Sequence, residues 1–376
     1  MDCPHRPPCP GCPRFGDPGI ARLHLAALNT LARAQGLDWP RVVEGPAIGH
    51  RHRARLAVRG RATSPKIGIF QEETHRITDT PRCLVHHPLV NVVAAAVKTA
   101  IRRTRVTLYG DTSHRGLLRY LQVVVERPSG TAQVVLVAND ETHDALDDTS
   151  AVVARELGDR LHSLWWNGNT SPTNAILGSR WHNWAGPETT RETIGGASVF
   201  YPPGAFGQAN LPLADRMVAL VHGWVPAGAR VLEMHAGVGA MGLGLAARGH
   251  TVVFNEVSRW SLVGLNAGIE ALDADARPRT RVLRGPAANH LAAIDGADVV
   301  ICDPPRRGLE PELLARLADD PPARLILVSC NPDAFLREAR TLLQASRTRL
   351  AALVPVALFP YTDHVETVAL FERGGG

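Results

Sequence analysis

Apolar, strand-like runs alternate with helix-like segments through the second half of the chain. Three of these runs are 230–234, 299–302 and 325–328. Strands that alternate with helices predict βαβ units and therefore a parallel sheet. Parallel strands end at the same edge of their sheet, and in open α/β folds this edge faces the ligand crevice. The side chains that follow these runs are therefore the first candidates for a functional site.

The first half of the chain has a different pattern, because a Cys-, Pro- and Gly-rich start precedes alternating strand-like segments. The expected strands pair at 55–59 with 66–70 and at 117–126 with 131–137, and further strands are expected at 161–166 and 175–177. Helices are expected at 20–34 and 89–103 in this half, and at 213–225 and 261–272 in the second, which ends in a strand at 365–371. The sequence predicts an α/β protein in which residues 1–200 form a mainly antiparallel α+β domain and residues 201–376 form a Rossmann-like domain.

Cys330 lies directly after the apolar run 325–328, in a Ser-Cys-Asn-Pro segment. A cysteine at the end of a buried strand, beside polar residues, is a better candidate for a reactive thiol than for inert core packing. Asp303 follows the run 299–302 in the same way. We therefore expect a candidate nucleophile and a carboxylate side by side over one site.

A glycine-rich turn follows the first of these runs. Gly237 and Gly239 stand between the run 230–234 and the next helix, and Glu256 ends the following strand. The glycines let the backbone approach a ligand, and an acidic residue at the second strand end is placed to hold a ribose. The third glycine of a dinucleotide fingerprint is missing, so NAD is disfavoured. Together with Asp303, the turn favours an S-adenosylmethionine-dependent methyltransferase.

Four cysteines could hold a metal. Cys3, Cys9 and Cys12 have the spacing C-x5-C-x2-C, and Cys83 stands alone further on. Disulfides are not expected in the reducing cytosol. Structural zinc usually pairs two short cysteine knuckles, and only one exists here, so the pattern favours a [4Fe–4S] cluster over zinc. Cys302 lies inside its strand and is expected to be core packing.

The chain carries a net charge of +5, and arginine supplies nearly all of its positive charge. Basic stretches at 50–66 and 102–105 favour nucleic-acid binding by the N-terminal half. No run approaches the roughly 18 uncharged apolar residues that span a bilayer, and the first residues lack the features of a secretion signal. We therefore expect a cytoplasmic protein with no membrane partner.

These motifs together resemble the RNA uracil-C5 methyltransferases of the iron–sulfur-containing bacterial 23S ribosomal RNA type. The resemblance covers nearly the whole chain, and the motifs come in the family's order. They are the four cysteines and the segments 53–56, 206–210, 237–239, 303–306, 329–332 and 359–366. The resemblance implies a monomer that transfers a methyl group from S-adenosylmethionine to C5 of a uridine in RNA. Ribosomal RNA is favoured over transfer RNA because cysteine-containing relatives mostly act there.

The resemblance also implies a role for each matching residue. Cys330 would add to C6 of the uracil, and Glu366 would remove the C5 proton so that the thiolate can leave. Asp303, Gln208 and Arg53 would contact the substrate, whose base must flip out of any stacked helix. The residues expected around the cofactor are Gln208, His235, Gly237, Gly239, Ala240, Glu256 and Asp303. Cys3, Cys9, Cys12 and Cys83 would hold the cluster.

The chain departs from the family's usual pattern around the cofactor. His235 stands where Phe or Tyr is usual, and Ala240 replaces a common Asn, so a side-chain contact to the cofactor is lost or rerouted. Pro286 stands where a polar residue is usual near the adenine. The small N-terminal RNA-binding barrel of some relatives is expected to be missing, so RNA contacts are expected within residues 1–200.

Two other functions fit parts of the sequence. A C5-methyltransferase acting on another RNA pyrimidine, such as a tRNA uridine or a cytosine, could use the same thiol chemistry. A non-catalytic RNA-binding protein with a structural metal site is the second alternative. The departures at the cofactor turn allow it, whereas Cys330 and Glu366 argue against it. Binding of S-adenosylmethionine would separate an enzyme from a binding protein.

Overall fold

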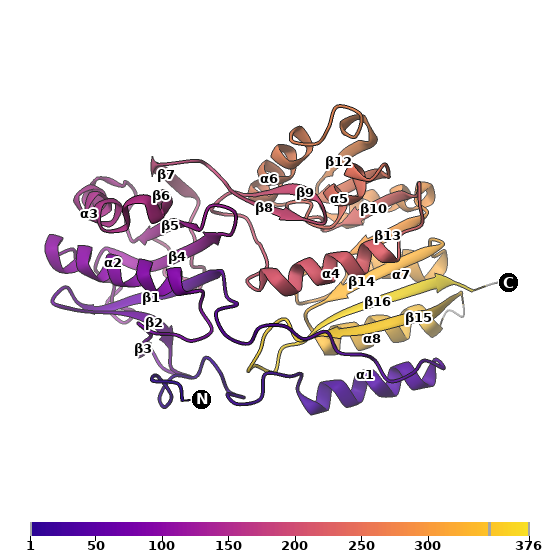
Figure 1. The fold of residues 1–376 in the computed structure, drawn as a ribbon, viewed down its shortest axis with the longest axis horizontal. Helices are drawn as coiled ribbons and strands as arrows, with labels where there is room; N and C mark the ends of the chain where they lie inside the picture. Colours follow the sequence, from indigo (N-terminus) through magenta and orange to yellow (C-terminus); the bar gives the residue numbers. More distant parts are fainter. Residues whose placement is uncertain (1, 345–346, 375–376) are drawn as a thin grey trace.

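The computed structural model describes residues 2–344 and 347–374, and it is built on two seven-stranded sheets that lie side by side (Figure 1). The first sheet has the order β3-β2-β1-β4-β5-β6-β7. Its strands are β1 (Arg53–Arg61), β2 (Ser64–Phe70), β3 (Ile77–Asp79), β4 (Leu118–Glu126), β5 (Thr131–Ala138), β6 (Leu161–Gly168) and β7 (Arg180–Ala185). All neighbours pair antiparallel except β5 and β6, which α3 (Asp147–Leu157) connects.

One face of the first sheet is covered by α3 and α2 (Pro88–Thr104). Alternation along β1 explains this arrangement, because Leu56 and Val58 are buried with the apolar face of α2. Arg53, Arg55 and Arg59 occupy alternate positions of β1 and project from the opposite face. The two predicted hairpins and the helix at 89–103 are confirmed.

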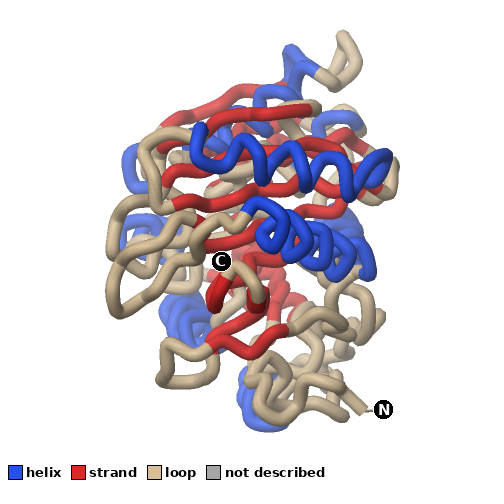
Figure 2. Tube along the Cα trace, turned by 90° about the vertical axis from the view of Figure 1, so that its left-hand side faces the viewer, coloured by secondary structure: helices blue, strands red, loops and turns tan. Residues whose placement is uncertain are grey.

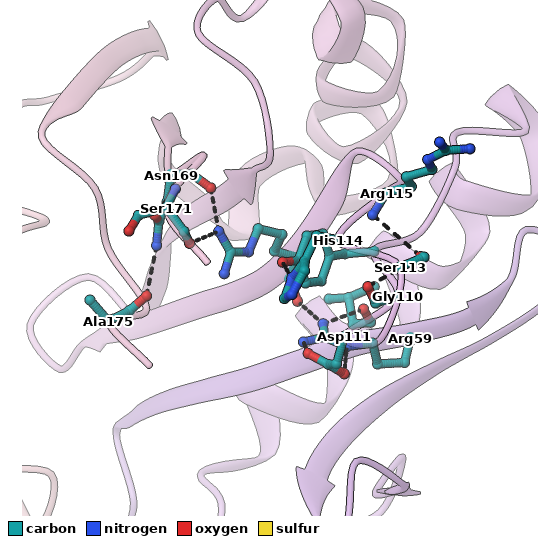
Figure 3. Close-up of polar contacts among 12 residues, drawn as sticks. Arg59, Gly110, Asp111, Ser113, His114, Arg115, Asn169, Ser171 and Ala175 are labelled. Atoms are coloured by element: carbon teal, nitrogen blue, oxygen red, sulfur yellow. Dashed lines mark hydrogen bonds and ion pairs between the residues drawn. The ribbon is translucent and has the colours of Figure 1, made fainter. Parts of the chain in front are cut away.

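The expected strand at 175–177 is wrong, and the chain forms a loop there. The Asn169 side-chain amide donates to the carbonyls of Ala175 (2.7 Å) and Ile176 (3.0 Å), as Figure 3 shows for Ala175. These carbonyls therefore accept hydrogen bonds from a side chain and not from the backbone of a neighbouring strand. The true edge strand, β7, follows a few residues later.

The second sheet has the order β12-β11-β10-β13-β14-β16-β15. Its strands are β10 (Arg230–Met234), β11 (Thr251–Glu256), β12 (Thr280–Arg284), β13 (Val299–Cys302), β14 (Arg324–Ser329), β15 (Thr348–Val356) and β16 (Glu366–Arg373). The first five in chain order are parallel, and β16 enters antiparallel between β14 and β15. The predicted Rossmann-like sheet is confirmed, and its central strands are buried along their whole length, as parallel strands with both faces covered require.

Helices flank the second sheet on both faces. They are α4 (Leu211–Gly223), α5 (Gly242–Ala247), α6 (Arg259–Glu270), α7 (Pro311–Asp319) and α8 (Pro332–Gln344). Short 3-10 helices lie at Asp144–Leu146, Gly158–Arg160, Arg277–Arg279 and Ala287–Gly296. A two-stranded ribbon, β8 (Thr190–Ile194) with β9 (Ala197–Tyr201), connects the two sheets and packs on α6. No helix in the described ranges is long and apolar enough to cross a membrane.

The N-terminal segment runs along both halves of the molecule. Residues 2–20 form loops (tan in Figure 2), and α1 (Arg22–Ala34) then packs against β15 and α8 (Figure 1). Leu28 and Ala32 are fully buried in the core of the second sheet. Val43 then pairs with Val356 at the edge of the same sheet. Thus α1 precedes the first sheet in sequence but packs with the second.

Candidate active site

The antiparallel entry of β16 brings two candidate catalytic residues together. Ser329 at the end of β14 pairs with Thr367 near the start of β16. The next residue on each side is Cys330 and Glu366, so both lie at the carboxyl edge of the parallel strands. Asp303 follows the neighbouring β13 at the same edge, and its backbone N–H reaches the Met234 carbonyl at 3.5 Å. The structure therefore gathers the expected nucleophile, the expected base and Asp303 at one place.

Glu366 is a deeply buried carboxyl. Its residue is 1% exposed, and neither carboxyl oxygen has a hydrogen-bond partner among the described residues. Burial, and then repulsion by Asp303, raise the pKa of Glu366 well above its usual range, whereas Arg306 acts in the opposite direction. Burial also raises the pKa of Asp303 to about 7. Two neighbouring carboxyls in one buried site cannot both ionise easily, so the pair retains a proton near neutral pH.

The Cys330 thiol is influenced by the same two carboxyls, Glu366 and Asp303. It is half-buried, and burial, Glu366 and Asp303 raise its pKa, with Arg306 opposing them. The thiol is therefore protonated in this state, and forming a thiolate requires a nearby proton acceptor. Cys302 differs, because it is completely buried within the apolar core of the second sheet, where the sequence placed it.

Asn331 joins the two loops that carry this group. Its side-chain amide donates to the Arg306 carbonyl at 2.9 Å, which ties the loop after β14 to the loop after β13. Its Oδ1 accepts from the backbone N–H groups of Asp333 (3.0 Å) and Ala334 (3.3 Å), so it also caps α8. Asn331 thus fixes the chain immediately after Cys330.

The loop after β13 has a second anchor that the sequence did not indicate. Glu338 on α8 is 4% exposed, and its Oε1 accepts from the Leu309 backbone N–H at 2.7 Å. Gly308 lies directly against this carboxylate with a φ of 91°, so a side chain there would collide with it. No motif spacing marks Glu338, because its partner is a backbone group.

The glycine-rich turn after β10 is organised around Glu256. The Glu256 carboxylate accepts from the backbone N–H groups of Gly237 (2.7 Å), Val257 (2.8 Å) and Ser258 (2.6 Å). Gly237 and Gly239 have φ values of 58° and 80°, which glycine adopts without steric cost. The turn therefore holds an open backbone beside an acidic side chain at the end of β11, as a nucleoside site requires.

Comparison with known proteins decides the family. The sequence profile described as tRNA (Uracil-5-)-methyltransferase matches residues 192–374. An uncharacterized RNA methyltransferase of Protochlamydia amoebophila is 33% identical over 381 residues, which cover 99% of this chain and 98% of that protein. The chain belongs to the tRNA (uracil-5-)-methyltransferase family. The predicted enzyme class, an S-adenosylmethionine-dependent RNA (uracil-C5-)-methyltransferase, is confirmed at this level.

A solved structure supports the same assignment for the fold. The tRNA (uracil(54)-C(5))-methyltransferase of Pyrococcus abyssi is 29% identical over 370 residues, which cover 96% of this chain and 85% of that protein. Its crystal structure in complex with S-adenosyl-L-homocysteine superposes with a TM-score of 0.76 and 27% identity, over 93% of this chain and 83% of that chain. The methyltransferase fold predicted for this chain is therefore confirmed.

His235 shows how this family member departs from the usual cofactor turn. It has a φ of 57°, and its Nε2 lies 2.9 Å from Oε2 of Glu310, which precedes α7. Its Nδ1 has no partner among the described residues. The contact with Glu310 was not predicted, because it joins two loops that are distant in sequence. Ala240 is half-buried and packs against the apolar core, so its small side chain contributes packing at this turn.

Arg53 and Gln208 lie together at the junction of the two sheets. They line one cavity with Tyr201 and Gly207. Arg53 donates from Nη1 to the Ala205 carbonyl at 2.6 Å and lies over the Tyr201 ring at 5.5 Å. Burial lowers its pKa to about 10, so it is still charged at neutral pH. The structure thus places Gln208 beside Arg53, on the segment 206–210.

The four cysteines expected to bind metal line one cavity, together with Arg51. Burial raises the pKa of the Cys12 thiol to about 11, and the thiols of Cys83, Cys9 and Cys3 add to this effect. Although all four belong to the described residues, no three of their sulfur atoms lie mutually within 4.8 Å.

Glu233 makes the stability of this family member depend on pH. It is 2% exposed, and burial raises its pKa from 4.5 to about 8, against hydrogen bonds from the backbone N–H groups of Gly242 and Met241 at the start of α5. A carboxyl with a raised folded-state pKa binds more protons in the folded than in the unfolded state. Its contribution to the free energy of unfolding is therefore present below about 4.5 and is lost as the pH rises to about 8.

We therefore expect Glu233→Gln to gain stability relative to the parent as the pH rises. The difference between their thermal unfolding midpoints should shift in favour of the variant between pH values of about 6 and 9. The matched control is Glu312→Gln, which changes an exposed carboxylate on α7. A pH-independent difference for Glu233→Gln would show that this carboxyl is not the source of the effect.

Proposed function

We propose that this chain transfers a methyl group from S-adenosylmethionine to C5 of a uridine in RNA through a covalent adduct between Cys330 and C6 of the base. The observation that carries the proposal is the pairing of Ser329 with Thr367, which sets Cys330 and Glu366 beside each other at the sheet edge. In this proposal residues 201–376 perform methyl transfer and residues 1–200 bind the RNA, in the cytoplasm and as a monomer.

The residues of the turn after β10 fit the cofactor. Gly237 and Gly239 leave the backbone accessible, and the Glu256 carboxylate is held at the strand end where a ribose would bind. Val257 follows it and is 64% exposed, so it offers an apolar surface to an adenine. The cofactor supplies an electrophilic methyl group. We propose that Asp303, His235, Ala240 and Gln208 complete its surroundings.

The proposed reaction uses Cys330 and Glu366 in sequence. The Cys330 thiolate adds to C6, and the electron pair of the C5–C6 double bond moves to form an enolate at O4. The C4–C5 π pair of this enolate then forms the bond from C5 to the methyl group, the bond from the methyl group to the sulfonium sulfur breaks, and S-adenosylhomocysteine leaves. The Glu366 carboxylate removes the proton from C5, the C5–C6 double bond forms again, and the C6–sulfur bond breaks to release the thiolate. A buried carboxylate with a raised pKa is a stronger base, which suits the last step.

The target RNA has two candidates. The sequence motifs favour 23S ribosomal RNA, whereas the Pyrococcus abyssi relative is named for position 54 of tRNA. Mass-spectrometric mapping of 5-methyluridine in RNA from cells with and without the gene tests the proposal and separates these candidates. Loss of one 5-methyluridine in either RNA supports the proposed reaction. Loss of 5-methylcytosine, or an unchanged modification pattern, would overturn it in favour of another pyrimidine or of a binding role.

The cysteine cavity fits a [4Fe–4S] cluster, held by Cys3, Cys9, Cys12 and Cys83. Four thiols line it. Three of them come from one C-x5-C-x2-C segment, a spacing that supports a cluster over the paired short knuckles of structural zinc. When bound, the cluster supplies a cross-link between the first residues and the start of the first sheet. The cysteine-rich segment also contacts the active-site loop, because the Arg14 N–H donates to the Tyr361 carbonyl at 3.0 Å and the Phe15 and Tyr361 rings lie 5.2 Å apart.

We expect the anaerobically purified protein to be brown, with absorbance near about 400 nm, and Cys12→Ser to lose this absorbance. The variant should also have a lower unfolding midpoint and reduced methyl transfer, because the segment that contacts Tyr361 is no longer fixed. Metal analysis of the parent and the variant measures iron and zinc directly. A colourless parent with stoichiometric zinc would contradict the cluster assignment.

A further inference from the structure

Strand β1 carries a row of arginines on the face of the first sheet that α2 leaves open. Arg53, Arg55 and Arg59 alternate with the buried residues that face α2. Alternate residues on a strand lie about 6.8 Å apart on one face, so Arg53 and Arg55 are direct neighbours in this row. Ala57 takes the next position and separates Arg55 from Arg59. These arginines differ in whether a carboxylate of the protein neutralises their positive charge.

Arg59 is neutralised within the protein. Its Nε and Nη2 each lie 2.7 Å from a carboxylate oxygen of Asp111 (Figure 3), and its Nη1 donates to the Arg119 carbonyl at 2.6 Å. Its guanidinium also lies over the rings of Tyr109 and Tyr120. Because Arg59 is 7% exposed and fully paired, it is a structural residue and has no capacity for a ligand.

Arg55 is held in a different way. Its Nε donates to Oε1 of Gln122 at 2.7 Å, and Gln122 is completely buried. Gln122 in turn donates from Nε2 to the Pro203 carbonyl at 2.7 Å, so its side chain is fixed at both ends. The guanidinium is therefore oriented by a neutral partner, and its two terminal amino groups remain available as donors.

Arg55 also lacks an anionic partner among the described residues. It forms no ion pair there, and burial alone lowers its pKa, with no carboxylate acting against it. The residue still has exposed surface. Because Arg55 is exposed, its free amino groups are accessible to an anion from solution. The oriented pair of amino groups matches the two oxygens of a phosphate.

The location of Arg55 connects it to the active site. The face that carries it is turned toward the second half, because Trp181 of β7 packs edge-on against Trp260 of α6 at 5.1 Å. Near Arg53, the His52 N–H donates to the Ala209 carbonyl at 2.8 Å. Asn210 then donates to the Leu358 carbonyl at 3.2 Å, on the segment that leads to Glu366.

We propose that Arg55, oriented by the buried Gln122, binds a phosphate of the RNA strand on the open face of the first sheet, close to the target uridine. The inference rests on the proposed function for its substrate class. It gives a specific role to Arg55, within the segment 53–56, and adds Gln122 as a positioning residue that no motif marks. The ligand is a backbone phosphate, so the contact should be independent of base sequence.

The test measures RNA affinity as a function of salt. The probe is a fluorescein-labelled RNA hairpin with uridines in its loop, and anisotropy titrations run from about 50 to 300 mM KCl. We expect Arg55→Gln to weaken binding about tenfold, as the loss of a charge-assisted contact does. The slope of log affinity against log salt should fall by about 0.7, the value for one phosphate contact on a single strand.

Two further variants make the result specific. Arg155→Gln removes an exposed arginine of α3, on the covered side of the sheet, and should leave both affinity and slope nearly unchanged. Arg55→Lys keeps the charge but loses the planar guanidinium that Gln122 orients, so the slope should persist while affinity falls severalfold. Parent-like affinity and slope in Arg55→Gln would overturn the proposal. A similar loss in Arg155→Gln would overturn it too, because the effect would then be net charge alone.

Different measurements would contradict the proposed function and the proposed phosphate contact. At saturating RNA, Arg55→Gln should still methylate, because the contact lies outside the reacting group. If the parent protein makes no 5-methyluridine but Arg55→Gln still loses the phosphate contact, the reaction is wrong and the binding site stands. Unchanged binding of S-adenosyl-L-homocysteine by Arg55→Gln shows that the variant is folded.

Discussion

Cys330→Ala is expected to abolish methyl transfer, with a loss of at least about a thousandfold, while binding of S-adenosyl-L-homocysteine stays unchanged. Without the thiol, C5 of uracil has no route to the electron-rich enolate that takes the methyl group. The cofactor turn lies after β10 and β11, so its hydrogen bonds do not involve Cys330. Isothermal titration with S-adenosyl-L-homocysteine, and methyl incorporation into RNA, measure the two properties separately.

An RNA with 5-fluorouridine at the target position gives the matching positive test. Fluorine at C5 cannot leave as a proton does, so the adduct formed by Cys330 should persist through denaturing electrophoresis. Cys330→Ala should form no such adduct. Cys302→Ala is the matched cysteine control, because Cys302 lies in the core, and it should still form the adduct even if its stability is lower. Full activity of Cys330→Ala would exclude the covalent route.

Sequence patterns predicted the features of this molecule that depend on local order. The apolar runs of β13 and β14 are buried along their lengths, and the residues that follow them lie at one edge because all parallel strands end there. The position of Cys330 beside the Asp303 loop follows from this rule alone. The hairpins of the first sheet were equally predictable from the sequence, because the alternation of apolar residues and the turn residues are local signals.

Features that depend on long-range packing were not predictable in this way. The proximity of Cys330 and Glu366 requires β16 to enter antiparallel between β14 and β15, which no local pattern specifies. The packing of α1 on the second sheet is a second example, since its apolar stripe fits any apolar surface. Motif analysis does not mark Glu310 or Glu338. Glu310 joins two loops that are distant in sequence, and Glu338 joins α8 to the loop after β13.

These unpredicted contacts have a common effect on the site. Asn331 and Glu338 both tie the loop after β13 to α8 or its start, and Arg14 and Phe15 brace the loop before β16. The loop that follows Cys330 and the loop that leads to Glu366 at the start of β16 are therefore both fixed by contacts from outside the sheet. Such fixing holds a thiol and a carboxyl at a set separation, which covalent catalysis with a separate base requires.

Glu366→Gln is expected to slow turnover about a hundredfold to ten-thousandfold and, unlike Cys330→Ala, to accumulate the methylated covalent adduct. The thiol can still add to C6, and C5 can still take the methyl group. Release of the thiolate is blocked, because it requires a base that removes the C5 proton. A denaturing gel with labelled RNA should show a protein–RNA band for Glu366→Gln, and the double variant with Cys330→Ala should show none.

The pH dependence of adduct release identifies the base. Burial and the neighbouring Asp303 raise the pKa of Glu366 well above its usual range, so the carboxyl must lose its proton before it can act. In single-turnover measurements, the release rate of the parent should therefore increase as the pH rises through this raised pKa, and Glu366→Gln should lack that increase. If Glu366→Gln instead releases product at the parent rate, Asp303, with its pKa of about 7, becomes the base. Because the two carboxyls share one buried site, only the variant can assign the proton transfer to one of them.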